Sequence, residues 1–197
     1  MAARFAYYDR LSKKDKAIYR KSDDAPSFVL PEVATLRPLA QAVSEALAKE
    51  KRVAVAKAST ALSDALCDQL GAPRVKLHVR ETRPAIGEGA ELHGLYTYAD
   101  EEEGTPPRIE VWMRTHALGK VVRFRTFLRT LVHELGHHFD LTLLDLADSF
   151  HTAGFYRRES SLVRQLLDLP PQPRRPRADA KAEAKPQPKR PSQLTLF

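Results

Sequence analysis

The chain has 197 residues, of which 43% are hydrophobic, so it can bury the core of one ordinary domain but has no room for a second catalytic domain. Its single cysteine, Cys67, excludes an internal disulfide and a cysteine-based zinc cage. The formal net charge is +7, and +5 of it comes from Pro170 to Pro191, where seven Lys or Arg accompany two acidic residues. Because no segment resembles a signal peptide or a membrane span, we expect a cytoplasmic protein.

The first seventy residues are predicted to form helices that serve as scaffold. Ser12 to Lys21 begins with a capping box, in which Ser12 and Asp15 are correctly spaced. A second helix is indicated by apolar residues at helical period, namely Leu36, Leu39, Ala40, Val43 and Leu47. A third helix, roughly Val53 to Leu70, is followed by Gly71, a typical C-terminal cap.

Three strands are predicted next, because each segment is rich in β-branched or aromatic residues. They are Val75 to Arg80, Leu92 to Tyr98 and Ile109 to Arg114. His78 and His93 fall within them and are expected to be ordinary sheet residues. The element order predicts an α+β domain with a short antiparallel or mixed sheet packed on the following helix.

That helix carries the most informative motif of the chain, HExxH. Val121 to Leu135 shows apolar residues at helical period and contains no proline. His133 and His137 are four residues apart, so a helix places both imidazoles on one face, where they can bind one zinc ion. Glu134 lies beside them, as the base that acts on water in such sites does.

A catalytic zinc site needs a third protein ligand, which must come from downstream. Leu143, six residues after His137, disfavours the metzincin arrangement. Glu159 lies on the apolar face of a later helix, where a carboxylate is costly unless it is paired or binds a metal. We therefore expect Glu159 as the third ligand, with two alternatives: a buried salt bridge for Glu159, and His151 as the ligand.

Two further residues of the metal helix are placed by its geometry. Asp140 follows His137 on the same face and is expected to orient a ligand imidazole through hydrogen bonding. His138 points to another face and is expected to be a solvated or hydrogen-bonded residue.

From Ile109 to Leu167 the chain resembles the gluzincin metallopeptidases, in which a second helix supplies a glutamate ligand. The resemblance implies a zincin-like domain that binds Zn²⁺ through His133, His137 and Glu159. It implies that Glu134 is the general base, with His151 and Tyr156 as candidate donors to the oxyanion. It also implies that the strand Ile109 to Arg114 offers an edge to an extended protein or peptide substrate.

The composition changes at Pro170. Residues 170–191 hold seven of the fourteen prolines and are predicted to be a disordered linker between a domain at 1–169 and a peptide at 192–197. The terminal QLTLF resembles the bacterial sliding-clamp-binding motif, whose contacts would be made by Gln193, Leu194, Leu196 and Phe197.

Together these features predict a zinc peptidase tethered to the replication sliding clamp and acting on proteins at or near DNA. The basic linker would add weak, non-specific DNA contact, and the clamp would bring the protein to the nucleoid. Two alternatives remain: a stress-response protease that cleaves a transcription regulator, and a non-catalytic clamp adaptor on a zincin scaffold. No membrane role is expected.

Overall fold

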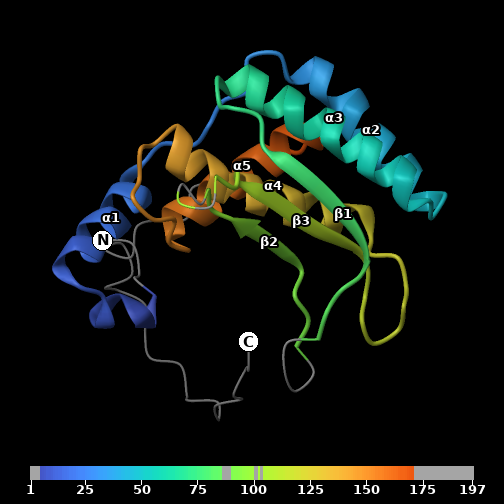
Figure 1. The fold of residues 1–197 in the computed structure, drawn as a ribbon. Helices are drawn as coiled ribbons and strands as arrows, with labels where there is room; N and C mark the ends of the chain where they lie inside the picture. The colour runs from blue at the N-terminus through green and yellow to red at the C-terminus, as the bar shows by residue number, and fades with distance from the viewer. Residues whose placement is uncertain (1–4, 86–89, 100–101, 103, 171–197) are drawn as a thin grey trace, which may run out of the picture.

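The computed structural model describes residues 5–85, 90–99, 102 and 104–170, and in this part the chain is an α+β fold (Figure 1). The predicted linker from Pro171 onward and the clamp-binding peptide lie outside the described residues. The elements in chain order are η1 (Ala6–Arg10), α1 (Lys13–Asp24), α2 (Val33–Ala48), α3 (Arg52–Leu70), β1 (Lys76–Thr82), β2 (Gly94–Thr97), β3 (Arg108–Arg114), α4 (Phe124–Thr142) and α5 (Ala153–Leu166).

The three strands form one mixed sheet in the order β1-β3-β2. The central strand, β3, is parallel to β1 and antiparallel to β2, so the predicted mixed sheet is confirmed. Because β3 is hydrogen-bonded on both sides, it has no free edge for a substrate, and the expectation that Ile109 to Arg114 offers one is wrong. The edge strand β2 lies beside α4, the helix that carries HExxH, and contacts it directly.

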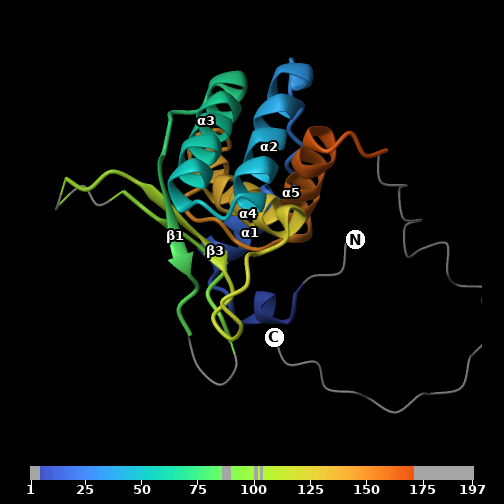
Figure 2. The same cartoon turned by 90° about the vertical axis from the view of Figure 1, so that its right-hand side faces the viewer.

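The helices α3 and α4 cover one face of the sheet, with α3 on β1 and α4 on β2 and β3 (Figure 2). Alternate residues of β3 point into this layer, and Ile109, Val111 and Met113 are fully buried there. From α4, Leu131 and Leu135 complete the contact. Cys67 is buried in the same core, as the sequence predicted. The packed layer between the sheet and α4 therefore supports the helix that carries the HExxH motif.

The HExxH helix, α4, begins at Phe124 rather than at Val121, where the sequence predicted its start. Val121 forms a bridge with Arg114, and the amide of Val122 donates to the carbonyl of Met113 at 2.8 Å. These two residues thus extend the sheet before the helix starts. The helix then runs without interruption through HExxH to Thr142.

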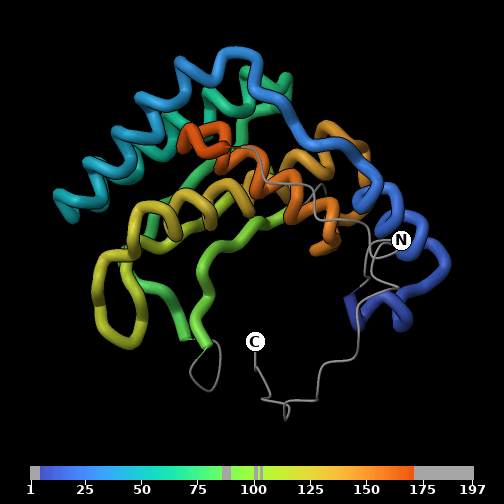
Figure 3. Tube along the Cα trace, turned by 180° about the vertical axis from the view of Figure 1, so that it is seen from behind, coloured from blue at the N-terminus to red at the C-terminus, as the bar shows by residue number. Residues whose placement is uncertain are grey.

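The N-terminal segment packs at the start of α5, away from the sheet (Figure 3). Its buried aromatic residues, Tyr8 and Tyr19, make an edge-to-face contact with ring centroids 4.9 Å apart. Gly154 allows α5 to lie close to the end of α1, because a Cβ atom there would lie 2.6 Å from the carbonyl oxygen of Ser22. Among the described residues, no helix combines the length and apolarity that a membrane span requires.

Candidate metal centre

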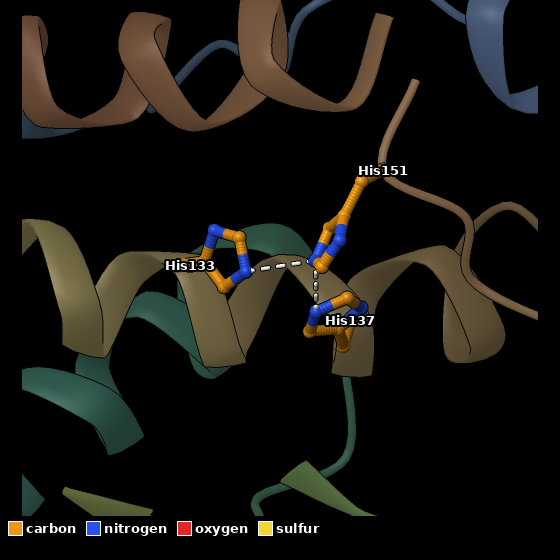
Figure 4. A group of neighbouring side chains, drawn as sticks. All are labelled: His133, His137 and His151. Atoms are coloured by element: carbon orange, nitrogen blue, oxygen red, sulfur yellow. Dashed lines mark hydrogen bonds between the residues drawn. The ribbon is translucent and has the colours of Figure 1, made fainter. Parts of the chain in front are cut away.

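Three histidines meet at the surface of α4 (Figure 4). His133 and His137 come from one face of the helix, and His151 comes from the segment that precedes α5. The Nε2 atom of His151 lies 3.0 Å from Nε2 of His133 and 3.1 Å from Nε2 of His137. Three ring nitrogens therefore face one point, close enough together to hold a metal ion.

The opposite nitrogen of both helix histidines has a partner that sets the ring's tautomer. Nδ1 of His133 lies 2.8 Å from a carboxylate oxygen of Glu159, which can only accept a hydrogen bond when ionised. Nδ1 of His137 lies 2.8 Å from the hydroxyl of Ser149, whose own hydrogen is donated to Asp140 at 3.0 Å. Both Nδ1 atoms must then carry the proton, which leaves the Nε2 lone pairs free for a metal.

Glu159 lies outside this group, which differs from the sequence-based expectation that it is the third ligand. Its carboxylate is 2% exposed and binds Nδ1 of His133 on one oxygen and Nε of Arg129, at 2.5 Å, on the other. The carboxylate thus sits on the side of the ring away from Nε2. His151, the alternative candidate, is the third member of the group, and the arginine pair considered for Glu159 is present.

A second buried network holds His137. Asp140 is fully buried, accepts from Ser149, and pairs with Arg158 at 2.7 Å. Arg158 also donates to the backbone carbonyl and the hydroxyl of Ser22 in α1. Asp140 is therefore connected to the His137 ring through Ser149, and the network extends to the N-terminal helix.

Burial keeps two of the imidazoles neutral. It lowers the pKa of His137 to about 3, with further lowering by His133 and His151. Burial and then His133 also lower the pKa of His151. A neutral imidazole is the form that binds a metal, so these residues fit a divalent transition metal in both geometry and protonation state.

Glu134 lies beside the histidines and is only 6% exposed. Burial raises its pKa to about 7, against the lowering effects of His133 and of the Tyr96 amide. Its side chain packs on Gly94 in β2, where a Cβ atom would lie 2.8 Å from both Cγ and Cδ of Glu134. A carboxylate with a pKa near neutrality is suited to accept and return a proton.

This carboxylate lines two cavities, of about 380 Å³ and about 230 Å³. Both are lined by Gly94, His133 and Glu134, and the smaller one continues along β2 to Tyr98. Tyr156 lines the larger cavity, and its ring stacks on His151 with centroids 5.7 Å apart. Because burial raises the pKa of Tyr156, its phenol stays protonated and can donate a hydrogen bond.

Several residues of the site had no signal in the sequence. Ser149, Gly94 and Tyr7, whose hydroxyl donates to the carbonyl of His151 at 2.8 Å, each depend on contacts between distant segments. His138 does lie apart from the metal centre, as predicted, because it is bonded to Tyr96 and to the carbonyl of Pro73. The clamp-motif residues are not among the described ones. Comparison with protein-family models, curated proteins and solved structures finds no match.

Proposed function

We propose that this chain is a zinc-dependent peptidase. The observation that carries the proposal is the convergence of three Nε2 atoms next to a buried carboxylate with a raised pKa. His133, His137 and His151 would hold the ion, and three protein ligands leave one position of a tetrahedral zinc open, as catalytic sites require. When bound, zinc supplies Lewis-acid polarisation of a carbonyl and a lower pKa for water.

The remaining chemistry belongs to the protein's own residues. Glu134 accepts a proton from the water that attacks the peptide carbonyl and passes it to the departing nitrogen as the C–N bond breaks. The phenol of Tyr156 is the candidate donor to the developing oxyanion, since it lies beside His151 at the cavity wall. His151, the other sequence candidate for that role, is already used as a ligand in this arrangement.

The substrate we propose is an extended polypeptide that adds to the free edge of β2. This strand has β3 on one side and, within the described residues, no strand on the other. Its backbone runs directly past Glu134, and Leu95 and Tyr98 are exposed along it. A peptide paired with this edge would present its carbonyl groups to the metal centre.

We further propose that QLTLF brings the peptidase to the bacterial sliding clamp, where proteins at or near DNA would be its substrates. The support for this step is the match of Gln193, Leu194, Leu196 and Phe197 to the clamp-binding pattern, next to a basic, proline-rich stretch. Cleavage of a transcription regulator remains the alternative for the same catalytic site.

The test is metal content and proteolysis of the full chain, with Glu134→Gln as the key variant. We expect about one zinc per wild-type chain, and the same content in Glu134→Gln with cleavage reduced at least about 100-fold. Glu45→Gln, an exposed change on α2, is the matched control and should behave as wild type.

Equal cleavage by wild type and Glu134→Gln would exclude this residue as the base. If the zinc-loaded wild type cleaves no protein, free or DNA-bound, yet still binds the clamp, the non-catalytic adaptor becomes the better description. Capture experiments with Glu134→Gln, which should hold substrates without cutting them, would separate DNA-associated proteins from a transcription regulator as targets.

A further inference from the structure

The larger cavity beside the metal centre has a polar wall made by one face of α4. Thr126, Arg129, Thr130 and His133 follow each other at helical spacing along this wall. Since both cavities share Glu134, a peptide that lies across this carboxylate must place a side chain from one flank of the cut bond in the larger cavity. A volume of about 380 Å³ is ample for a single side chain.

Among the residues that line this cavity, Arg129 is the one whose side chain is always positively charged. Its Nε atom is engaged by Glu159, whereas its two terminal nitrogens have no hydrogen-bond partner among the described residues. The side chain is 58% exposed, so these nitrogens reach the cavity without a large desolvation cost. The bond to Glu159 also fixes the guanidinium plane, which is the preorganisation that a bidentate carboxylate contact needs.

Beyond the cavity, the charge at the start of α4 has the same sign as Arg129, whereas the carboxylates of Glu134 and Glu159 line the cavity itself. Lys120, Arg123 and Arg125 flank the start of α4, and none of them has an ion-pair partner in the part of the chain that the structure describes. The first turn of α4 contains no acidic residue, although a helix start favours negative charge. Glu159 offsets one positive charge, so the end of α4 beyond the cavity retains a positive field that attracts an anion.

We propose that this cavity is a specificity pocket for an aspartate or glutamate side chain next to the cut bond, with its carboxylate held by the terminal nitrogens of Arg129. The proposal rests on the peptidase function proposed above and names the substrate class of that same site. Asp and Glu peptides fit better than a nucleic acid, because the pocket accommodates a side chain rather than a duplex.

The test compares matched peptides that differ only in Glu against Gln at the position flanking the cut bond. We expect the wild-type zinc-loaded chain to favour the Glu peptide about 10-fold in kcat/KM. The Glu134→Gln chain, which does not cut, should show the same preference in peptide binding by fluorescence anisotropy. Arg129→Gln should reduce the preference to near parity in both assays, and Lys57→Gln on α3 is the charge-matched control.

Arg129 also donates to Glu159, so its replacement could alter the metal site, and zinc content is measured in every variant. The readout is the preference for the Glu peptide over the Gln peptide within each variant. The double change Arg123→Gln with Arg125→Gln leaves that contact intact and should lower the preference about 2-fold at low salt. If the wild type cleaves the Glu and Gln peptides with equal kcat/KM, the acidic specificity pocket is overturned and the peptidase function is not. The acidic pocket is also overturned by a preference for a Lys peptide, or by Arg129-dependent binding of duplex DNA without any peptide preference. If the chain neither cleaves nor binds any peptide, the proposed peptidase function is overturned as well.

Discussion

Glu134 and Glu159 are both buried carboxylates beside His133, but their partners give them different roles. Glu159 is bonded to the His133 ring through one oxygen and to Arg129 through the other, so both of its oxygens are already engaged. Glu134 packs against Gly94 and lines both cavities, and burial raises its pKa to about 7. The surroundings of the two glutamates, rather than residue type, therefore separate Glu159, proposed to orient the His133 ring, from Glu134, proposed to move a proton.

The Nδ1 partners should control metal affinity more than stability. Ser149→Ala removes the acceptor for His137, and Glu159→Gln places an amide donor against Arg129 or His133. We expect each change to weaken zinc binding about 10- to 100-fold in competition with a chelator. Ser63→Ala is the control, because this buried hydroxyl on α3 has no partner in the described structure. Unchanged zinc affinity in both site variants would show that the ring orientations do not depend on these bonds.

At the scale of elements, the sequence predicted the types and order of the main helices and strands because each carries a local signal, such as apolar periodicity, a capping box or β-branched and aromatic content. The HExxH helix and its two histidines are local in this sense, since four residues of helix place them on one face. The position of β3 at the centre of the sheet depends on pairing between distant strands, and no pattern within Ile109 to Arg114 encodes it. The third ligand was ambiguous for the same reason: His151 lies outside a helix and carries no periodicity.

The contact between α1 and α5 is the element-scale feature that most affects the site. A Cβ atom at position 154 would meet the backbone of α1, which cannot rotate away as a side chain can. Gly154→Ala should therefore displace α1, with the cost of about 1–3 kcal/mol typical of overpacking. Because Ser22 in α1 is bonded to Arg158 and so to Asp140, zinc affinity should fall with the melting temperature.

Ser160→Ala on the same helix is the control for Gly154→Ala and should change neither quantity. A stable Gly154→Ala protein with wild-type zinc affinity would show that the docking of α1 is independent of the metal centre. Loss of zinc affinity with little loss of stability would instead show that the Ser22 connection is the stronger of the two effects.

At the scale of the whole molecule, the chain separates a nearly neutral domain from a basic stretch. Residues 170–191 carry +5 of the formal charge of +7, whereas the domain contains the entire metal centre and its buried networks. In the described part of the chain, the buried residues of the main hydrophobic cluster lie between Leu30 and Leu166. Catalysis and recruitment are therefore expected to be separable.

Two variants test this separation: the double substitution Leu196→Ala and Phe197→Ala, and a chain that stops at residue 170. Both should keep zinc content and peptide cleavage, because the described contacts that hold the three histidines are made by Glu159, Ser149 and Tyr7 within the domain. Both should lose binding to the bacterial clamp, for which we expect a dissociation constant in the micromolar range in the full chain, typical of a short peptide that becomes ordered on binding. Thr195→Ala changes the unspecified position of the motif and should bind as wild type.

The chain that stops at residue 170 should also lose most of its affinity for DNA. That affinity is expected to fall as salt rises, because the logarithm of the binding constant decreases by about 0.9 per phosphate contact for each unit of the logarithm of salt concentration. Clamp binding that survives the loss of Leu196 and Phe197 would place the recruiting surface on the domain instead.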